Sequence, residues 1–234
     1  MTRATFHLEA KQLLNRRSAS LWLVSLVAVF TLSLSILGAP GPGILLDLLL
    51  IGGVVWLRRS GWRSLGFCRP KSWRKYLLLA LLLSLLIQFL LAFALDPVIR
   101  FLTDTPIDLS PFDHLRGNLK ALLTWLLIVW FLVVFIEEII FRGFLMLELR
   151  RLLGDSQQGM FINLALTSVL FGLAHWYQGP SGILGTGFVG FLLGWIFIRN
   201  GFNLWLPILV HGFIDTIGLT LIYFNADQFL EQFW

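Results

Sequence analysis

Two adjacent glutamates and an arginine interrupt a strongly apolar stretch in the middle of the sequence. Glu137, Glu138 and Arg142 lie within a hydrophobic run that begins at Leu122. A charged side chain near the centre of a bilayer costs roughly 2.5–3.5 kcal/mol on insertion scales. A segment that only had to cross a membrane would not contain three such residues. We therefore expect them to have a chemical task.

The spacing of these three residues assigns them different tasks. Glu138 and Arg142 are four residues apart, one turn along the same helix face, and we expect Arg142 to neutralise Glu138. Glu137 is rotated by about 100° and has no partner in its own helix. An unpaired carboxylate in an apolar environment is suited to general-base catalysis, so Glu137 is the principal candidate. The alternative is a structural ion pair with one spare acid.

Two histidines occur in similar apolar settings. His175 follows Phe171 by four residues, and alone it would be explained equally well by a hydrogen bond to a neighbouring helix. Beside the glutamates it becomes a candidate partner for a bound water or metal. His211 and Asp215 are also four apart, so both side chains can point into one cavity. Asp215 could orient the imidazole, or donate a hydrogen bond if protonated, and a structural His–Asp pair is the alternative.

The elements that must position these residues are membrane helices. The chain of 234 residues is 57% hydrophobic and 13% charged, with a mean hydropathy of +0.82. These values are typical of polytopic membrane proteins. We expect one all-α, membrane-embedded domain over residues 1–234, a transmembrane bundle of about seven spans, or eight, around an intramembrane polar cavity. The predicted spans are about 19–38, 43–57, 76–95, 120–146, 160–177, 183–199 and 202–224.

The distribution of charge predicts the orientation of the bundle. Most Lys and Arg residues fall on the side of the N-terminus, and only Arg100, Arg116 and Lys120 fall opposite. The positive-inside rule then places the N-terminus in the cytoplasm, in a multi-pass protein of the cell membrane. The basic residues gather at helix ends, where anionic lipid headgroups lie, so we expect the lipid bilayer and no nucleic acid as a partner. An outer loop from Asp96 onwards should contain no helix, because Pro97 would break it.

Two smaller features have structural explanations. Trp62, Phe67 and Trp73 alternate with basic residues in segment 58–75, which is typical of a stretch anchored at the headgroups. Cys68 is the only cysteine, so a disulfide within the chain and a thiolate metal cluster are excluded.

The glycines near the sixth predicted span have two possible readings. Gly187, Gly190 and Gly194 form a small-residue stripe that lets a neighbouring helix pack closely. Nearby, Ser181 lies in a Gly-Pro-Ser-Gly sequence that matches the nucleophile pattern of rhomboid serine proteases, with His211 as a conceivable base. That scheme leaves both glutamates unexplained, and we rank it below the carboxylate reading.

Taken in order, the patterns Glu-Glu-x-x-x-Arg, Phe-x-x-x-His and His-x-x-x-Asp resemble the three motifs of the CPBP family. This family includes the type II CAAX prenyl proteases, bacterial Abi-type proteins and bacteriocin-processing relatives. The matching segments are EEIIFRGFL from Glu137, FGLAH from Phe171 and NLWLPILVHGFID from Asn203. The resemblance covers about residues 120–220, and it makes residues 120–224 the expected catalytic core.

The resemblance implies an intramembrane glutamic endopeptidase without a cofactor. Its four catalytic residues would be Glu137, His175, His211 and Asp215. Glu137 would activate a water that His175 helps to hold, and His211 with Asp215 would stabilise the oxyanion. Glu138 and Arg142 would support the site. The substrate would be a peptide or membrane protein, with or without a lipid anchor.

One departure from the family pattern and two rival functions stay open. The well-studied prenyl proteases carry asparagine where this chain has Asp215. An amide donates to an oxyanion and an ionised carboxylate repels it, so Asp215 must be protonated or serve His211. The first rival is a zinc protease with Glu137, His175 and His211 as ligands. The second is a non-catalytic membrane helper or proton-coupled carrier.

Overall fold

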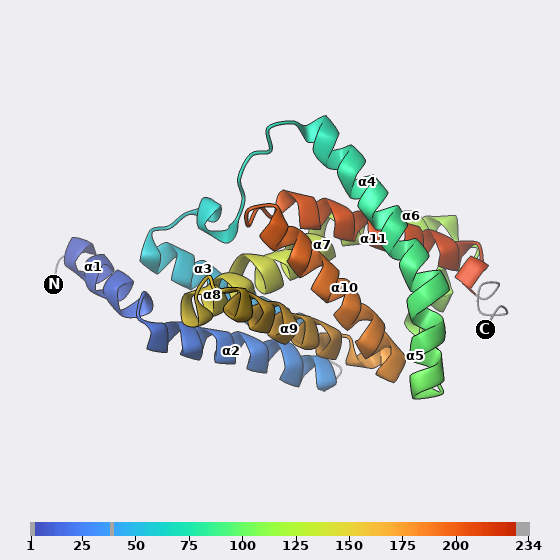
Figure 1. The fold of residues 1–234 in the computed structure, drawn as a ribbon, viewed down its shortest axis with the longest axis horizontal. Coiled ribbons are helices and arrows are strands. Elements are labelled where there is room, and N and C mark those ends of the chain that lie inside the picture. Colours follow the sequence, from blue (N-terminus) through green and yellow to red (C-terminus); the bar gives the residue numbers. More distant parts are fainter. Residues whose placement is uncertain (1–2, 38–39, 228–234) are drawn as a thin grey trace.

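A computed structural model describes residues 3–37 and 40–227, and the regular secondary structure of this part of the chain is entirely helical, without strands (Figure 1). Five helical segments are long and apolar enough to cross a membrane, and a sixth is added if the pair Leu8–Leu14 and Arg17–Ser33, bent by 75°, counts as one span. The prediction of an all-α, multi-pass membrane protein is confirmed. The expected count of about seven spans is not. The five segments are Trp73–Thr103, Leu119–Leu153, Gln157–Ala174, Trp176–Arg199 and Trp205–Tyr223.

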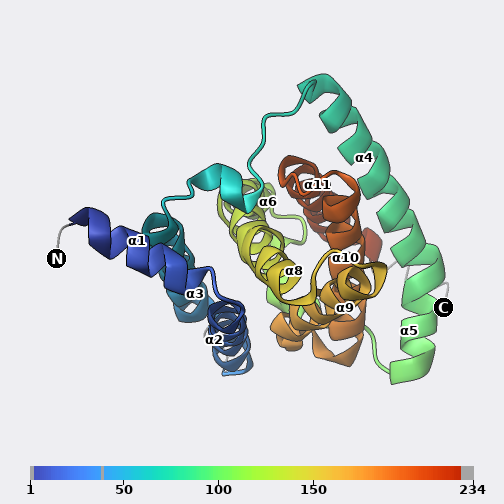
Figure 2. The same cartoon turned by 60° about the vertical axis from the view of Figure 1, so that its left-hand side comes forward.

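The three N-terminal helices form one side of the molecule. These are α1 (Arg3–Leu14), α2 (Arg17–Ile36) and α3 (Pro40–Arg58), and α2 packs against α3, α8 and α9. Figure 2 shows them on the side of the bundle opposite α4. Buried polar contacts hold them in place: Arg58 is paired with Glu148 of α8, and the Ser20 hydroxyl donates to the same carboxylate at 2.6 Å. A buried ion pair therefore joins the N-terminal helices to the core, in addition to apolar packing.

The segment between α3 and α4 packs on the start of α11 (Trp205–Tyr223). It contains a 3-10 turn, η1 (Trp62–Leu65). The rings of Phe67 and Trp73 lie 5.5 and 5.0 Å from the ring of Trp205. The backbone N–H of Leu204 donates to the carbonyl of Gly66 at 2.9 Å. Phe67 and Trp73 therefore fix this segment to the bundle, whereas Trp62 stays exposed.

The expectation that Pro97 ends the helix was wrong. Helix α4 (Trp73–Leu90) passes through a π-helical turn, η2 (Leu91–Leu95), directly into α5 (Asp96–Thr103). Pro97 is the second residue of α5 and directly follows the π-helical turn, where the regular ladder of helix hydrogen bonds is already shifted, so a residue without an N–H is tolerated there. The irregular outer segment therefore begins only at Asp104 and leads into a 3-10 turn, η3 (Ser110–Leu115).

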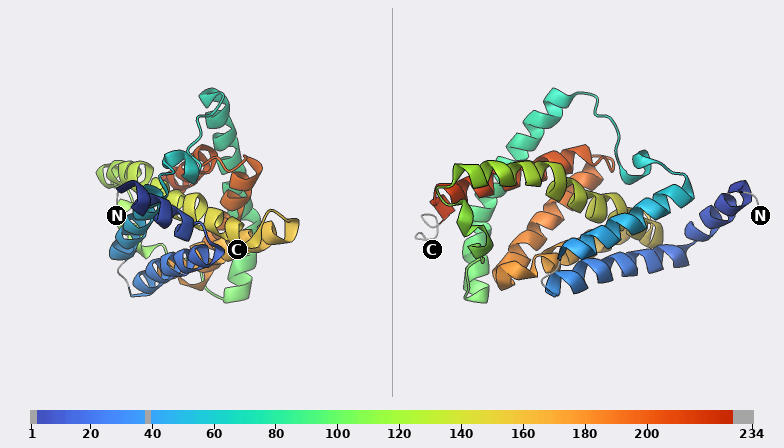
Figure 3. Two further views of the ribbon diagram at one scale, coloured as in Figure 1. Left: turned by 90° about the vertical axis from the view of Figure 1, so that its left-hand side faces the viewer. Right: turned by 180° about the vertical axis from the view of Figure 1, so that it is seen from behind.

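The long helix that carries the glutamates has five parts, and Figure 3 shows it from behind as one continuous rod. The parts are α6 (Leu119–Ile128), η4 (Val129–Val133), α7 (Val134–Glu138), η5 (Ile139–Met146) and α8 (Leu147–Leu153). Both η segments are π-helical, a geometry that is rare and frequent at functional sites. The glutamates thus lie on a short α-helical piece between two widened turns.

Helices α9 (Gln157–Ala174) and α10 (Gly179–Arg199) pack closely through glycines. A Cβ atom on Gly172 would lie 2.4 Å from the carbonyl oxygen of Ile183, and one on Gly194 would lie 2.6 Å from Leu164. A Cβ atom on Gly190 would lie 2.9 Å from the Phe171 ring. The predicted packing role of the glycine stripe is confirmed at Gly190 and Gly194.

Candidate active site

Three helices bring the predicted site residues together. Helix α7 supplies Glu137 and Glu138, the following π-helical segment supplies Arg142, and α11 supplies the His211–Asp215 pair. His175 caps the end of α9. Helix α11 packs against α6, α7 and α10, so residues more than seventy positions apart in the sequence meet.

The predicted pair of Glu138 and Arg142 forms in the core. The Nη1 of Arg142 donates to Oε1 of Glu138 at 2.7 Å, and its Nη2 donates to the carbonyl of Gly190 at 2.9 Å. The guanidinium also lies 4.6 Å from the centre of the Phe171 ring. The Glu138 side chain is 0% exposed and that of Arg142 is 2% exposed. Such a pair is tolerated in an apolar interior because the two charges neutralise each other, although Oε2 of Glu138 is buried without a hydrogen-bond partner.

Glu138 also holds His211. The Nδ1 of His211 lies 2.9 Å from Oε1 of Glu138, which assigns a proton to Nδ1 as the donor. The Nε2 atom faces two other carboxylates, with Oε2 of Glu137 at 3.8 Å and Oδ2 of Asp215 at 3.6 Å. The sequence offered Asp215 as one residue that could orient the imidazole. The structure instead gives the shorter contact to Glu138, from another helix.

Glu137 has no described hydrogen-bond or ion-pair partner in its own helix, as the helix spacing predicted. Its side chain is 18% exposed, and its Oε2 atom is buried without a hydrogen-bond partner. The distance of 3.8 Å to Nε2 of His211 exceeds a direct hydrogen bond. Asp215 is more open, with a side chain that is 27% exposed. A buried polar atom of this kind needs a partner, and water or substrate is the natural one.

His175 lies on the Asp215 side of the site. Its Nδ1 is 2.8 Å from the carbonyl oxygen of Phe171, one turn earlier in α9, and its ring packs on that of Phe171 at 4.8 Å. It interacts electrostatically with Asp215. Across the described part of the chain, no hydrogen bond or ion pair joins His175 to Glu137. The fixed Nδ1 leaves Nε2 as the ring atom that can meet a ligand.

Sequence reasoning missed Tyr177. This residue follows His175 by two positions, stacks on its ring at 5.9 Å and interacts electrostatically with Glu137 and Asp215. The only signal in the sequence was an aromatic residue close to a motif histidine, which is weak in a chain this rich in aromatics.

The rhomboid-like reading finds no support in the contacts of Ser181. Its hydroxyl donates to the carbonyl oxygen of Thr105 at 2.5 Å and lies 2.6 Å from the Oγ1 of Thr103. His211 is engaged elsewhere, by Glu138. Ser181 thus joins α10 to the end of α5.

No group of three or more His, Cys, Asp or Glu side chains within residues 3–37 and 40–227 has the geometry of a metal site. Of the three residues in the zinc alternative, Glu137 and His211 face each other. His175 contacts Phe171 and Tyr177 instead.

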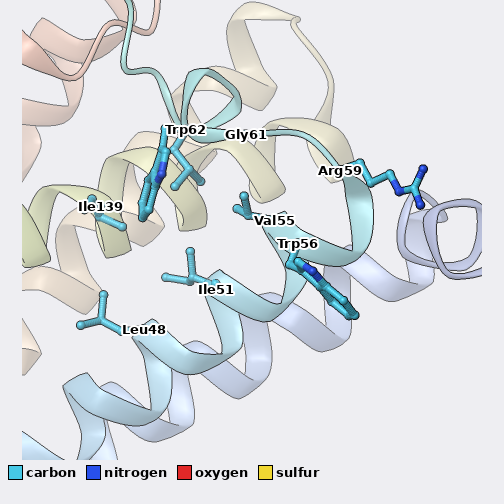
Figure 4. A pocket seen from close by; sticks show the side chains of 10 residues that line it. Leu48, Ile51, Val55, Trp56, Arg59, Gly61, Trp62 and Ile139 are labelled. Carbon is cyan, nitrogen blue, oxygen red and sulfur yellow. The ribbon is translucent and has the colours of Figure 1, made fainter. Parts of the chain in front are cut away.

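An apolar pocket of about 630 Å³ lies on the α3 side of the long helix (Figure 4), and none of the predicted site residues lines it. It lies between α3 and η1, with Leu48, Ile51 and Trp62 in its wall. Ile139, which directly follows Glu138 in the chain, closes it on the side of the long helix. An apolar space therefore lies beside the helix that carries both glutamates.

Buried acids and histidines from three membrane helices define a class of protein, the intramembrane hydrolases. Comparison with known families makes this specific. Residues 119–217, which contain all six site residues, match the family model described as type II CAAX prenyl endopeptidase Rce1-like. This segment belongs to the CAAX prenyl protease (CPBP) family, as the three motifs indicated. Residues 119–217 are accordingly those of a CAAX-type intramembrane protease, a family whose members act on a peptide or protein substrate. No curated protein and no solved structure shows significant similarity to the chain.

Proposed function

We propose that the protein hydrolyses a peptide bond with a water molecule activated by Glu137. The observation that carries the proposal is the Oε2 atom of Glu137, which is buried, has no hydrogen-bond partner and faces Nε2 of His211 at 3.8 Å. A gap of this length between two polar atoms suits a bridging water. A carboxylate beside such a water can take its proton during attack on a carbonyl carbon.

The other residues then have complementary tasks. Glu137 accepts the proton of the water and later passes it to the leaving amine. His211, oriented by Glu138 through Nδ1, presents Nε2 to the oxygen of the tetrahedral intermediate. A proton on Nε2 would stabilise the developing oxyanion. Asp215, at 3.6 Å from Nε2, would favour that proton.

His175 and Arg142 have different roles in this proposal. His175 has its Nδ1 engaged by the Phe171 carbonyl, so its Nε2 would help to hold the water or the substrate. Arg142 neutralises Glu138 and anchors it to the backbone of α10 at Gly190. We infer that Arg142 supports the site without touching the substrate.

The proposed substrate is a peptide or membrane-protein segment, with or without a lipid anchor. The apolar pocket beside Ile139 supports this proposal, because it offers about 630 Å³ of space for an apolar portion of such a substrate. We further propose that the protein resides in the cell membrane with its N-terminus in the cytoplasm, on the grounds of the positive-inside rule.

The test is the variant Glu137→Gln in purified protein incubated with a peptide library, with products identified by mass spectrometry. Loss of a general base should slow cleavage by about 10²–10⁴-fold. Glu9→Gln, at an exposed glutamate of α1, is the matched control and should cleave like the wild type. Equal cleavage by the wild type and Glu137→Gln would refute the assignment. No cleavage by any of the three would favour the helper or carrier reading.

A second experiment separates the glutamic mechanism from the zinc alternative. Wild-type protein is dialysed exhaustively against a chelator, and its metal content is measured by elemental analysis. We expect metal-free protein to retain full cleavage. Activity that disappears on chelation and returns with zinc would establish the metal version.

A further inference from the structure

Tyr177 lies at the edge of the site but belongs to none of the three motifs. It sits in a single 3-10 turn, η6 (Trp176–Gln178), that joins α9 to α10 directly after His175. The residue is 46% exposed, so part of it can be reached from outside the bundle. Its ring stacks beside that of His175 with an interplanar angle of 35°. Its hydroxyl interacts electrostatically with the carboxylates of Glu137 and Asp215.

A buried glutamine fixes the position of this hydroxyl. The Nε2 of Gln178 donates to the phenolic oxygen of Tyr177 at 3.2 Å. Gln178 is itself held by its backbone, because its N–H donates to the carbonyl of His175 at 2.9 Å and its carbonyl accepts from Asp108 at 3.0 Å. A phenol that accepts one hydrogen bond still has its own proton to donate. The described contacts of Tyr177 leave that proton available.

Gly182 makes room for this arrangement. A Cβ atom at position 182 would lie 2.1 Å from the Cβ of Gln178 and 3.1 Å from its Oε1. Only glycine therefore leaves Gln178 in the place from which it holds the Tyr177 hydroxyl. The turn, the buried amide and the glycine act together to hold a neutral O–H donor beside the ring of His175.

We propose that the Tyr177 hydroxyl donates a hydrogen bond to the carbonyl oxygen of the scissile peptide as that oxygen becomes an anion. The proposal rests on the proposed glutamate-activated hydrolysis. It supplies a neutral donor, which an ionised Asp215, standing where related prenyl proteases have an amide, does not offer. The phenolic proton stays on Tyr177, so no covalent bond to this residue forms or breaks.

A purely structural role makes a different prediction. Trp176 and Tyr177 are adjacent, exposed aromatic residues at a helix end, and such residues commonly anchor helices at the membrane interface. Anchoring depends on the ring and not on the hydroxyl. Tyr177→Phe keeps the ring and removes only the O–H, so this single variant separates the two roles.

The experiment measures kcat and KM for the library peptide that the wild type cleaves fastest. Loss of one oxyanion donor should lower kcat of Tyr177→Phe by about 100–1000-fold and leave KM nearly unchanged. Trp176→Phe, the neighbouring exposed aromatic residue, is the control and should retain wild-type kcat. The double variant Tyr177→Phe/Asp215→Asn should regain part of the lost kcat, because an amide supplies an N–H donor.

An inhibitor adds a readout that anchoring would not change. A peptide aldehyde of the same sequence forms a hydrate that resembles the tetrahedral intermediate. Its inhibition constant should rise in Tyr177→Phe in proportion to the fall in kcat/KM. Wild-type kcat and inhibition in Tyr177→Phe, together with slow cleavage by Tyr177→Ala, would overturn the proposal in favour of anchoring. If Glu137→Gln is inactive and Tyr177→Phe is fully active, the role of Tyr177 is refuted and the proposed function stands. If Glu137→Gln is fully active, the proposed function itself is refuted.

Discussion

The two members of the buried ion pair should differ in what their removal does to stability. Breaking a buried pair by removing one partner destabilises a protein by about 3–5 kcal/mol, because an uncompensated charge remains. In Arg142→Met, the carboxylate of Glu138 keeps the Nδ1 of His211 at 2.9 Å. In Glu138→Leu, the guanidinium of Arg142 keeps only the neutral carbonyl of Gly190 and the face of Phe171. We therefore expect a loss of about 3 kcal/mol for Arg142→Met and about 5 kcal/mol for Glu138→Leu.

The double variant should separate stability from activity. Replacing both members of a buried pair by apolar residues of similar size is often neutral. Glu138→Leu/Arg142→Met should therefore unfold with a smaller loss of free energy than Glu138→Leu alone. Peptide cleavage should nevertheless remain abolished, because the Nδ1 of His211 has lost its acceptor.

The assay is denaturant unfolding of purified protein in detergent, followed by tryptophan fluorescence, with peptide cleavage measured in parallel. Asp155→Asn is the control variant, because it also removes the carboxylate partner of an arginine. Asp155 pairs at an exposed position with Arg150, which lies on the same long helix as Arg142. It should leave the free energy of unfolding unchanged within error. Additive losses in the double variant, or a greater loss for Arg142→Met than for Glu138→Leu, would refute the reasoning.

Three further predictions concern other parts of the fold and the site. Gly172→Ala should lower the free energy of unfolding by about 1–3 kcal/mol, because its Cβ would meet a backbone carbonyl. Gly53→Ala, which faces open space within α3, should raise it by about 0.5–1 kcal/mol. The same unfolding assay checks both glycine variants. Their free energies of unfolding should change in opposite directions, and equal changes would contradict the packing argument. Arg116→Gln should lower the free energy of unfolding by about 1.5–3 kcal/mol, because Arg116 donates two hydrogen bonds to Asp227, each at 2.8 Å. An unchanged free energy of unfolding would show that this contact does not stabilise the protein. Asp215→Asn should retain peptide cleavage, and its inactivation would mean that the carboxylate itself is required.

Local spacing predicted those parts of the site that lie on one helix. The pair of Glu138 and Arg142 follows from four-residue spacing. The close packing of α9 and α10 follows from the glycine stripe. Each of these needs only helical geometry and the residue types of one segment.

Contacts between helices lay beyond that reasoning. The bond from His211 to Glu138 joins residues 73 positions apart, and it depends on how α11 packs against α7. From sequence, Asp215 was a candidate partner of His211, because it lies one turn away in the same helix. The π-helical turns were also missed, since a shift in the hydrogen-bond pattern leaves hydropathy almost unchanged. Pro97 was misjudged because its effect depends on its position within a helical turn.

The bond between Arg58 and Glu148 bears on what counts as the smallest working unit of this protein. The family resemblance spans residues 119–217, yet Glu148 within that span is 2% exposed and is satisfied by Ser20 and Arg58 from outside it. An excised core would expose this carboxylate and would also lose the wall that α3 gives to the pocket beside Ile139. A minimal protease engineered from this chain, or a chimaera that exchanges its core, must therefore carry residues 17–58 along with the motif helices.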